Sequence, residues 1–221
     1  MLRVKICGLT RMEDALLACE LGADAAGFIF YSKSPRSISM QEAAAIAERL
    51  PEYVTRVGVF VDSPIAAIEE HRHAIGLQAL QFHGDYSTKE IAEFSSAWLI
   101  KAARLRDQSS LASLEDFQNL VHAFLLDTYE KGKLGGTGKI FDWQLAIAAK
   151  RFGRIILAGG LNPKNVQEAV RFVQPYAIDV NSGVESAPGI KDHDKLRHLF
   201  EQVKEFRRDW KSPNAPAFPV A

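Results

Sequence analysis

Short apolar runs and longer amphipathic runs alternate along the whole chain. The apolar runs are rich in Val, Ile, Leu and Phe, which is typical of strands that are buried on both faces. Eight strands are expected at residues 2–7, 25–30, 56–61, 79–82, 99–102, 122–127, 155–158 and 176–180. Eight helices are expected at residues 12–21, 41–50, 64–74, 89–94, 111–119, 143–151, 164–172 and 192–208.

Several of these boundaries carry residues that favour the start or the end of a helix. Ser and Asn side chains accept hydrogen bonds from the first backbone N–H groups of a helix, and glycine adopts the backbone conformation that ends one. The start signals are Ser39, Ser63, Ser87 and Asn162, and the stop signals are Gly22 and Gly153. The boundaries therefore support an alternating strand and helix pattern.

Eight strand–helix units in about 210 residues predict an α/β protein with a single-domain (β/α)8 (TIM) barrel. Residues 1–210 are expected to form the barrel, and residues 211–221 a proline-rich tail without a catalytic role. An open, doubly wound sheet is the alternative. A Gly-x-Gly-x-x-Gly turn after the first strand would favour that alternative, and residues 7–12 read Cys-Gly-Leu-Thr-Arg-Met instead.

Two glycine-rich turns follow the last two expected strands. Residues 157–162 read Leu-Ala-Gly-Gly-Leu-Asn, and residues 179–185 read Asp-Val-Asn-Ser-Gly-Val-Glu. Glycine lets a ligand approach the backbone closely, and many (β/α)8 barrels hold a phosphate group at the turns after strands seven and eight. The alternative interpretation is that both are ordinary glycine turns that bind no ligand. The residues expected to bind the phosphate of a small ligand are Gly136, Gly159, Gly160, Ser182 and Gly183.

Composition narrows the classes of partner. The chain has 27 Lys and Arg and 27 Asp and Glu, so no basic field favours nucleic acid or an anionic membrane. No apolar stretch approaches the roughly 20 residues of a membrane span, and no signal peptide is recognised. Cys7 and Cys19 fit neither a disulfide framework nor a zinc site. We expect a cytoplasmic monomer or homodimer that binds a small phosphorylated ligand and needs no metal.

Cys7 ends the first expected strand, and barrel chemistry takes place at the carboxyl ends of strands. If Val4 and Ile6 face the helices, the alternation of a strand points Lys5 and Cys7 into the barrel. Cys7 is then either a base or nucleophile, or a small buried hydrophobic residue. Cys19 lies on the first expected helix, where packing in the core is expected.

Three further candidates also stand at or just after strand ends. Asp127 follows an apolar run, where a carboxylate is costly unless it is paired or used. It either caps the next loop or exchanges a proton with a ligand, with Cys7 as the partner group. The planar guanidinium of Arg36 suits a ligand carboxylate or is solvated. His83 binds substrate or makes a structural hydrogen bond. Lys5 is expected at the barrel floor, paired with a carboxylate such as Asp179, itself a candidate substrate-binding residue.

Taken in order, the segments of residues 3–205 closely resemble the phosphoribosylanthranilate isomerase family of tryptophan biosynthesis. The matching pieces are Lys5–Arg11, Ser34–Arg36, Val57–Val61, Gln81–Gly84, Gly135–Gly138, Phe141–Trp143, Ala158–Leu161 and Asp179–Glu185. Two residues depart from the family pattern: Phe82 stands where leucine is usual, and Asn181 stands where serine is common. Neither departure removes a candidate catalytic group.

The resemblance implies an Amadori rearrangement, the third step of the tryptophan branch from chorismate. N-(5-phospho-β-D-ribosyl)anthranilate becomes 1-(2-carboxyphenylamino)-1-deoxyribulose 5-phosphate without a cofactor. Asp127 would be the general acid, Cys7 the general base, and Arg36 the group that holds the anthranilate carboxylate. A related barrel of histidine biosynthesis is the alternative enzyme, but that family has aspartate at the end of strand one. A barrel kept only as a binding scaffold would have lost these groups.

Overall fold

The expected strands close into a barrel in a computed structural model that describes residues 1–128 and 143–209. All eight run parallel and pair in chain order, so the predicted fold class is confirmed. The strands are β1 (Arg3–Ile6), β2 (Ala25–Phe30), β3 (Thr55–Val61), β4 (Ala79–His83), β5 (Trp98–Leu105), β6 (Ala123–Thr128), β7 (Ile155–Leu157) and β8 (Ala177–Val180). The barrel closes where β1 pairs with β8, with Lys5 opposite Asp179.

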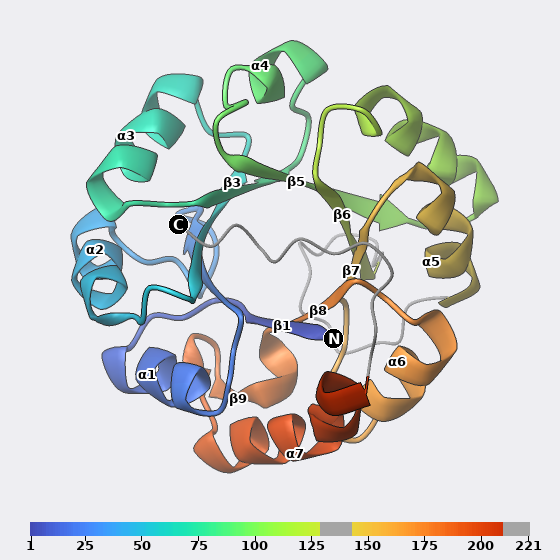
Figure 1. The fold of residues 1–221 in the computed structure, drawn as a ribbon. Coiled ribbons are helices and arrows are strands. Elements are labelled where there is room, and N and C mark those ends of the chain that lie inside the picture. Colours follow the sequence, from blue (N-terminus) through green and yellow to red (C-terminus); the bar gives the residue numbers. More distant parts are fainter. Residues whose placement is uncertain (129–142, 210–221) are drawn as a thin grey trace.

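The helices form a ring around the barrel (Figure 1). The α-helices are α1 (Met12–Glu20), α2 (Met40–Arg49), α3 (Ile65–Ile75), α4 (Thr88–Ala92), α5 (Trp143–Ala149), α6 (Val166–Val173) and α7 (His193–Asp209). Three 3-10 helices accompany them: η1 (Gln108–Phe117), η2 (Lys150–Phe152) and η3 (Ser182–Val184). No helix within the described ranges has the length and apolar character that a membrane span needs.

Local sequence explains several helix boundaries. Ser39 and Ser87 each form a reciprocal capping box, with Glu42 and Glu90 respectively. Gly22 and Gly153 follow helix ends with positive φ, as expected. Ser63 does not cap α3, because its hydroxyl donates to the Val61 carbonyl, 3.4 Å away.

Three local expectations were wrong or incomplete. Residues 111–119 are not an α-helix, because the segment forms η1, whose three-residue period aligns the two buried leucines, Leu111 and Leu114. The Asn162 side chain accepts a hydrogen bond from the Lys164 N–H at 2.9 Å, but α6 starts only at Val166. A short antiparallel pair, β9 (Glu185–Ala187) and β10 (Ile190–Lys191), was missed. Strands of two or three residues are too short for an alternation to be recognised.

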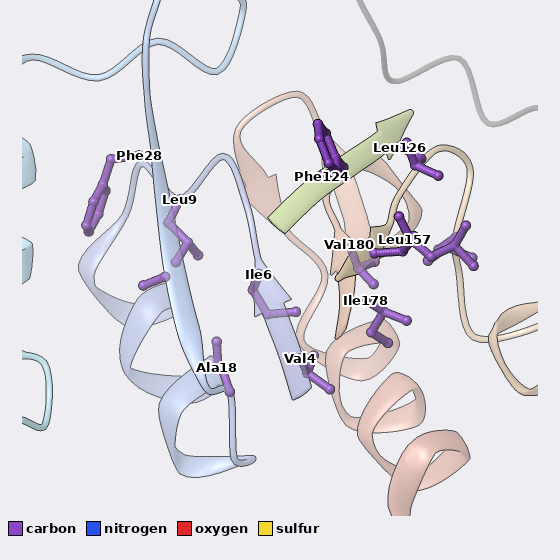
Figure 2. Close-up of a cluster of buried hydrophobic side chains, with 14 of the residues drawn as sticks. Val4, Ile6, Leu9, Ala18, Phe28, Phe124, Leu126, Leu157, Ile178 and Val180 are labelled. Carbon is purple, nitrogen blue, oxygen red and sulfur yellow. The ribbon is translucent and has the colours of Figure 1, made fainter. Parts of the chain in front are cut away.

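Alternation along the strands divides the buried side chains into two layers. Val4 and Ile6 of β1 belong to the larger cluster between barrel and helices, together with Ile178 and Val180 of β8 (Figure 2). The inward set fills the barrel, and at its amino end the rings of Trp98 and Tyr176 stack with centroids 6.1 Å apart. Because that end is filled, a ligand enters at the carboxyl end.

Candidate active site

A cavity of about 440 Å³ opens at the carboxyl ends of the strands. Side chains at or just after the ends of all eight strands line it. Among the residues expected from the sequence, those that line it are Cys7, Arg36, His83, Asp127, Gly159, Gly160, Asp179 and Ser182. Gly183 does not line it, and Gly136 lies outside the described residues. The fold therefore brings eight of the ten candidate residues to one hollow.

Cys7 continues the β1 ladder, donating its N–H to the Val180 carbonyl at 3.0 Å. Its side chain points inward, as the alternation predicts, and the residue is 3% exposed. Burial and the carboxylate of Asp179 raise the pKa of the thiol, while the cations of Lys5 and Lys191 oppose them. Gly27 leaves room for the thiol, since a Cβ there would lie 2.9 Å from Sγ.

Lys5 lies fully buried beneath Cys7 and pairs with Asp179, as expected. Its Nζ donates to Oδ1 of Asp179 at 3.0 Å and to Oε1 of Gln81 at 2.9 Å. Burial lowers the pKa of Lys5, but Asp179 and Cys7 together raise it by more than burial lowers it, so the net shift is upward. The ammonium therefore stays charged and supplies a fixed positive charge beside the thiol.

The Lys5 hydrogen bond also determines the tautomer of His83. Because Nζ of Lys5 only donates, the contacted Gln81 atom is the oxygen, and the Gln81 amide nitrogen donates to Nε2 of His83. Burial, followed by the cations of Lys5, Arg104 and Lys101, lowers the pKa of His83 to about 3. The ring is thus neutral at physiological pH, with its proton on Nδ1.

Arg36 is already held on one edge. Its Nε lies 2.9 and 3.0 Å from the two carboxylate oxygens of Glu185, and its Nη2 lies 2.7 Å from Oε2. A guanidinium has a second edge, formed by Nη1 and Nη2, that can bind another planar anion. Arg36 lines the cavity with its side chain 14% exposed, so it can engage a ligand while it remains paired.

The first glycine turn requires glycine for its backbone. Gly159 and Gly160 have φ of 76° and 67°, the left-handed region that residues with a Cβ rarely adopt. The side-chain amides of Asn162 and Asn165 each donate to the Gly160 carbonyl at 3.0 Å. The turn is thereby held in place at the wall of the cavity.

Close packing requires glycine at position 183. A Cβ there would lie 1.9 Å from the Leu161 carbonyl oxygen and 2.9 Å from Cβ of Asn162. The second turn therefore rests directly on the first. Ser182, one residue earlier, reaches the cavity.

The sequence interpretation assigned no role to several polar residues at or beside this site, among them Gln81, Arg104, Glu185 and Lys191. Gln81 and Arg104 line the cavity, and their inward positions on β4 and β5 follow the same alternation that points Cys7 inward. That alternation was the available signal for Gln81, but Arg104 lies beyond the expected strand at residues 99–102. Glu185 and Lys191 lie on β9 and β10, where no sequence period indicated them.

Cys19 and Trp143 pack against other side chains and do not line the cavity. Cys19 is 3% exposed within the core, as expected, and burial raises the pKa of its thiol to about 11. Trp143 packs against Phe172 with ring centroids 5.8 Å apart. Among the described residues, no His, Cys, Asp and Glu side chains gather in a group that could hold a metal ion.

The fold and the cavity place this protein among the (β/α)8-barrel enzymes. Its site combines a thiol, a carboxylate and two glycine turns. The family model described as N-(5'phosphoribosyl)anthranilate (PRA) isomerase matches residues 4–202. The chain belongs to this family. It is an isomerase of tryptophan biosynthesis that converts N-(5'-phosphoribosyl)anthranilate to 1-(2-carboxyphenylamino)-1-deoxyribulose 5-phosphate.

Individual relatives agree with the family model. N-(5'-phosphoribosyl)anthranilate isomerase of Pelobacter propionicus is 45% identical over 209 residues, covering 95% of this chain and 99% of the relative. The crystal structure of phosphoribosyl anthranilate isomerase from Thermotoga maritima superposes with a TM-score of 0.87 and 40% identity, covering 93% of this chain and 100% of that one. A related structure with TM-score 0.84, 38% identity and the same coverage contains reduced 1-(o-carboxyphenylamino)-1-deoxyribulose 5-phosphate.

Proposed function

We propose that the cavity is the active site, with Cys7 as general base and Asp127 as general acid. The observation that carries this proposal is that a thiol from β1 and a carboxylate from β6 line one cavity. On one side β7 and β8 separate the two strands, and on the other side β2 to β5 separate them. Groups on different sides of the mouth can act on two atoms of one bound substrate.

The reaction moves protons and electrons within the substrate. Asp127 donates a proton to the furanose ring oxygen, the bond from that oxygen to C1 breaks, and the nitrogen lone pair forms the C1=N bond of a Schiff base. The Cys7 thiolate removes the proton from C2, and the electron pair forms C1=C2 while the C1=N pair returns to nitrogen. Protonation at C1 and loss of the enol proton give the ketone. C1 is reduced and C2 oxidised, so no external redox partner is needed.

Cys7 needs help to act as a base near neutral pH, because its pKa lies above the ordinary value. The buried Lys5 ammonium stabilises a thiolate at that position, and its charge is maintained by Asp179. A small thiolate fraction, stabilised in this way, is sufficient for proton abstraction when the substrate C2 is held against it.

Recognition involves the two charged ends of the substrate. The free edge of Arg36 binds the anthranilate carboxylate. Backbone N–H groups of the turns at Gly159-Gly160 and Ser182-Gly183 bind the phosphate, with Gly136 nearby, and His83 and Asp179 contact the sugar from the cavity wall. The positive φ of Gly159 and Gly160 and the position of both turns at the cavity support this arrangement.

The test is a fluorescence assay of turnover with N-(5'-phosphoribosyl)anthranilate formed in place. Loss of a general acid or base typically costs about 10²–10⁴-fold. We therefore expect Cys7→Ser and Asp127→Asn each to lower kcat by at least about 10²-fold, with a much smaller change in binding of the reduced product. Cys19→Ser is the matched control and should retain activity. Near-normal kcat in Cys7→Ser would overturn the assignment.

The assembly and organisation of the chain follow the same proposal. One Thermotoga maritima relative is described as dimeric, and we propose that this chain is a monomer or homodimer in the cytoplasm. We further propose residues 1–210 as the catalytic domain and residues 211–221, outside the described residues, as a tail without a catalytic role. Light scattering of the purified full chain gives its molar mass and so tests the assembly. The turnover assay, applied to the full chain and to a chain that ends at residue 210, tests whether the tail is dispensable for catalysis.

A further inference from the structure

We propose that Glu185 is a positioning residue for the reaction, which holds Arg36 so that its free edge meets the substrate carboxylate. Glu185 contacts Nε and Nη2 of Arg36 with both carboxylate oxygens, at 2.7 to 3.0 Å. This fixes the rotation of the guanidinium plane as well as its position. The edge formed by Nη1 and Nη2 is left for a second planar anion.

Glu185 can orient Arg36 because two other groups hold its carboxylate. Its Oε1 accepts from Nζ of Lys191 at 3.1 Å and from the Gly189 N–H at 3.2 Å, and its side chain is 5% exposed. The two strands β9 and β10 place Lys191 directly across from Glu185. The carboxylate is therefore fixed before any ligand arrives.

Lys191 connects this pair to the rest of the barrel. Its Nζ also donates to Oδ1 and to the backbone oxygen of Asn181, at 3.0 and 3.2 Å, and its backbone N–H donates to Oδ2 of the fully buried Asp14 on α1. Asn181, the residue that departs from the usual serine, thus supplies an additional acceptor. The orientation of Arg36 is consequently set by α1 and by the end of β8.

The charges in this network favour an anionic ligand. Two cations, Arg36 and Lys191, contact the single Glu185 carboxylate, so a substrate carboxylate on the free edge of Arg36 adds a favourable interaction. Glu185 also partly neutralises Arg36, so it weakens simple attraction. What it adds is orientation, which matters for a planar, bidentate contact and little for a point charge.

This inference rests on the proposed role of Arg36, and the test separates the two. We would measure binding by calorimetry for the reduced product and for the same compound without its carboxylate. In Glu185→Gln, affinity for the carboxylate compound should fall at least about tenfold, within the value of a charged hydrogen bond. Affinity for the compound without it should change less than about twofold.

Four further variants complete the experiment. Arg36→Ala should abolish discrimination between the compounds, and Arg36→Ala with Glu185→Gln should bind about as weakly as Arg36→Ala alone. Glu205→Gln, which removes the exposed ion pair with Arg171, is the matched control and should behave as wild type. If Glu185→Gln does not fold, Glu185→Asp keeps the charge beside Lys191 and should still lose affinity for the carboxylate compound alone.

Equal weakening of both compounds by Glu185→Gln, or full additivity with Arg36→Ala, would overturn the positioning role. So would unchanged discrimination in Glu185→Asp. If instead Arg36→Ala leaves discrimination intact, the proposed carboxylate contact of Arg36 is wrong, and the positioning role fails with it. The two failures are therefore distinguished by the Arg36 variant.

Discussion

At the scale of single residues, the same chemical group has different properties at different places in this molecule. Both cysteines are almost fully buried, but Cys7 faces the cavity with cations beside it, and Cys19 faces the core. Burial raises the pKa of both thiols, and only around Cys7 do Lys5 and Lys191 oppose that rise. Reactivity is therefore expected at Cys7 alone.

Alkylation should report this difference. Below its raised pKa, the thiolate fraction of Cys7 grows about tenfold per pH unit, so inactivation by iodoacetamide should be slow at pH 7 and accelerate steadily toward pH 9. Bound product should protect the enzyme. Mass spectrometry should find the modification on Cys7, because Cys7 lines the cavity, whereas Cys19 packs in the core, where burial raises the pKa of its thiol to about 11. Inactivation that persists in Cys7→Ser and disappears in Cys19→Ser would contradict this.

His83 gives a prediction that depends on its tautomer. Its proton is on Nδ1, a position that an Asn amide nitrogen can occupy and that a Gln amide cannot. His83→Asn should therefore keep KM within about threefold, while His83→Gln should raise it about tenfold, the value of one lost hydrogen bond. Because the pKa is about 3, the wild-type KM should show no histidine titration between pH 5 and 8. Equal effects of both variants would contradict the assigned tautomer.

At the scale of elements, the two glycine turns act as one unit. Gly183 packs against the Leu161 carbonyl, and the Asn162 and Asn165 side chains hold the first turn by donating hydrogen bonds to the Gly160 carbonyl. The sequence places these turns about 20 residues apart, and only the pairing of β7 with β8 brings them together. A change at Gly183 therefore affects stability as well as ligand binding.

Gly183→Ala should lower the free energy of unfolding by about 3 kcal/mol, the upper end of the usual cost of overpacking. The reason is that a Cβ would lie 1.9 Å from a backbone oxygen that cannot move freely. Urea denaturation measures the change. Gly76→Ala is the control: no atom lies within 4 Å of its Cβ, and its φ of 67° leaves only a cost of about 1 kcal/mol. A loss at Gly183 no larger than at Gly76 would show that the turns are not tightly packed.

At the scale of the whole molecule, stability and chemistry lie at opposite ends of the barrel. The stacked rings of Trp98 and Tyr176 fill the amino end, and the cavity occupies the carboxyl end. Between them, the buried Lys5–Asp179 pair crosses from β1 to β8, where the barrel closes. Removing one partner of a buried pair leaves an uncompensated charge, so this pair links closure of the fold to the electrostatics of Cys7.

The period of the hydrophobic pattern and the spacing of the motifs by themselves determined most of the predicted fold and many of the candidate site residues. Short apolar runs between amphipathic runs indicated the eight strands, alternation along the first strand indicated the inward direction of Cys7, and the ordered motifs indicated the family. They did so because buried parallel strands and glycine turns leave signals within a few neighbouring residues. The same alternation pointed Gln81 inward, where the signal was present but not used, whereas Arg104 lies beyond the expected strand at residues 99–102 and became inward-facing only because β5 extends to Leu105.

Only the tertiary structure decided which distant groups meet. Arg36 and Glu185 are 149 positions apart, and their contact depends on a hairpin of very short strands that has no recognisable period. The proton on Nδ1 of His83 is determined by Lys5, on another strand, through Gln81. Local sequence determines what each residue can do, but hydrogen bonding and burial act over a few ångströms in space, and those neighbours exist only after the barrel has closed.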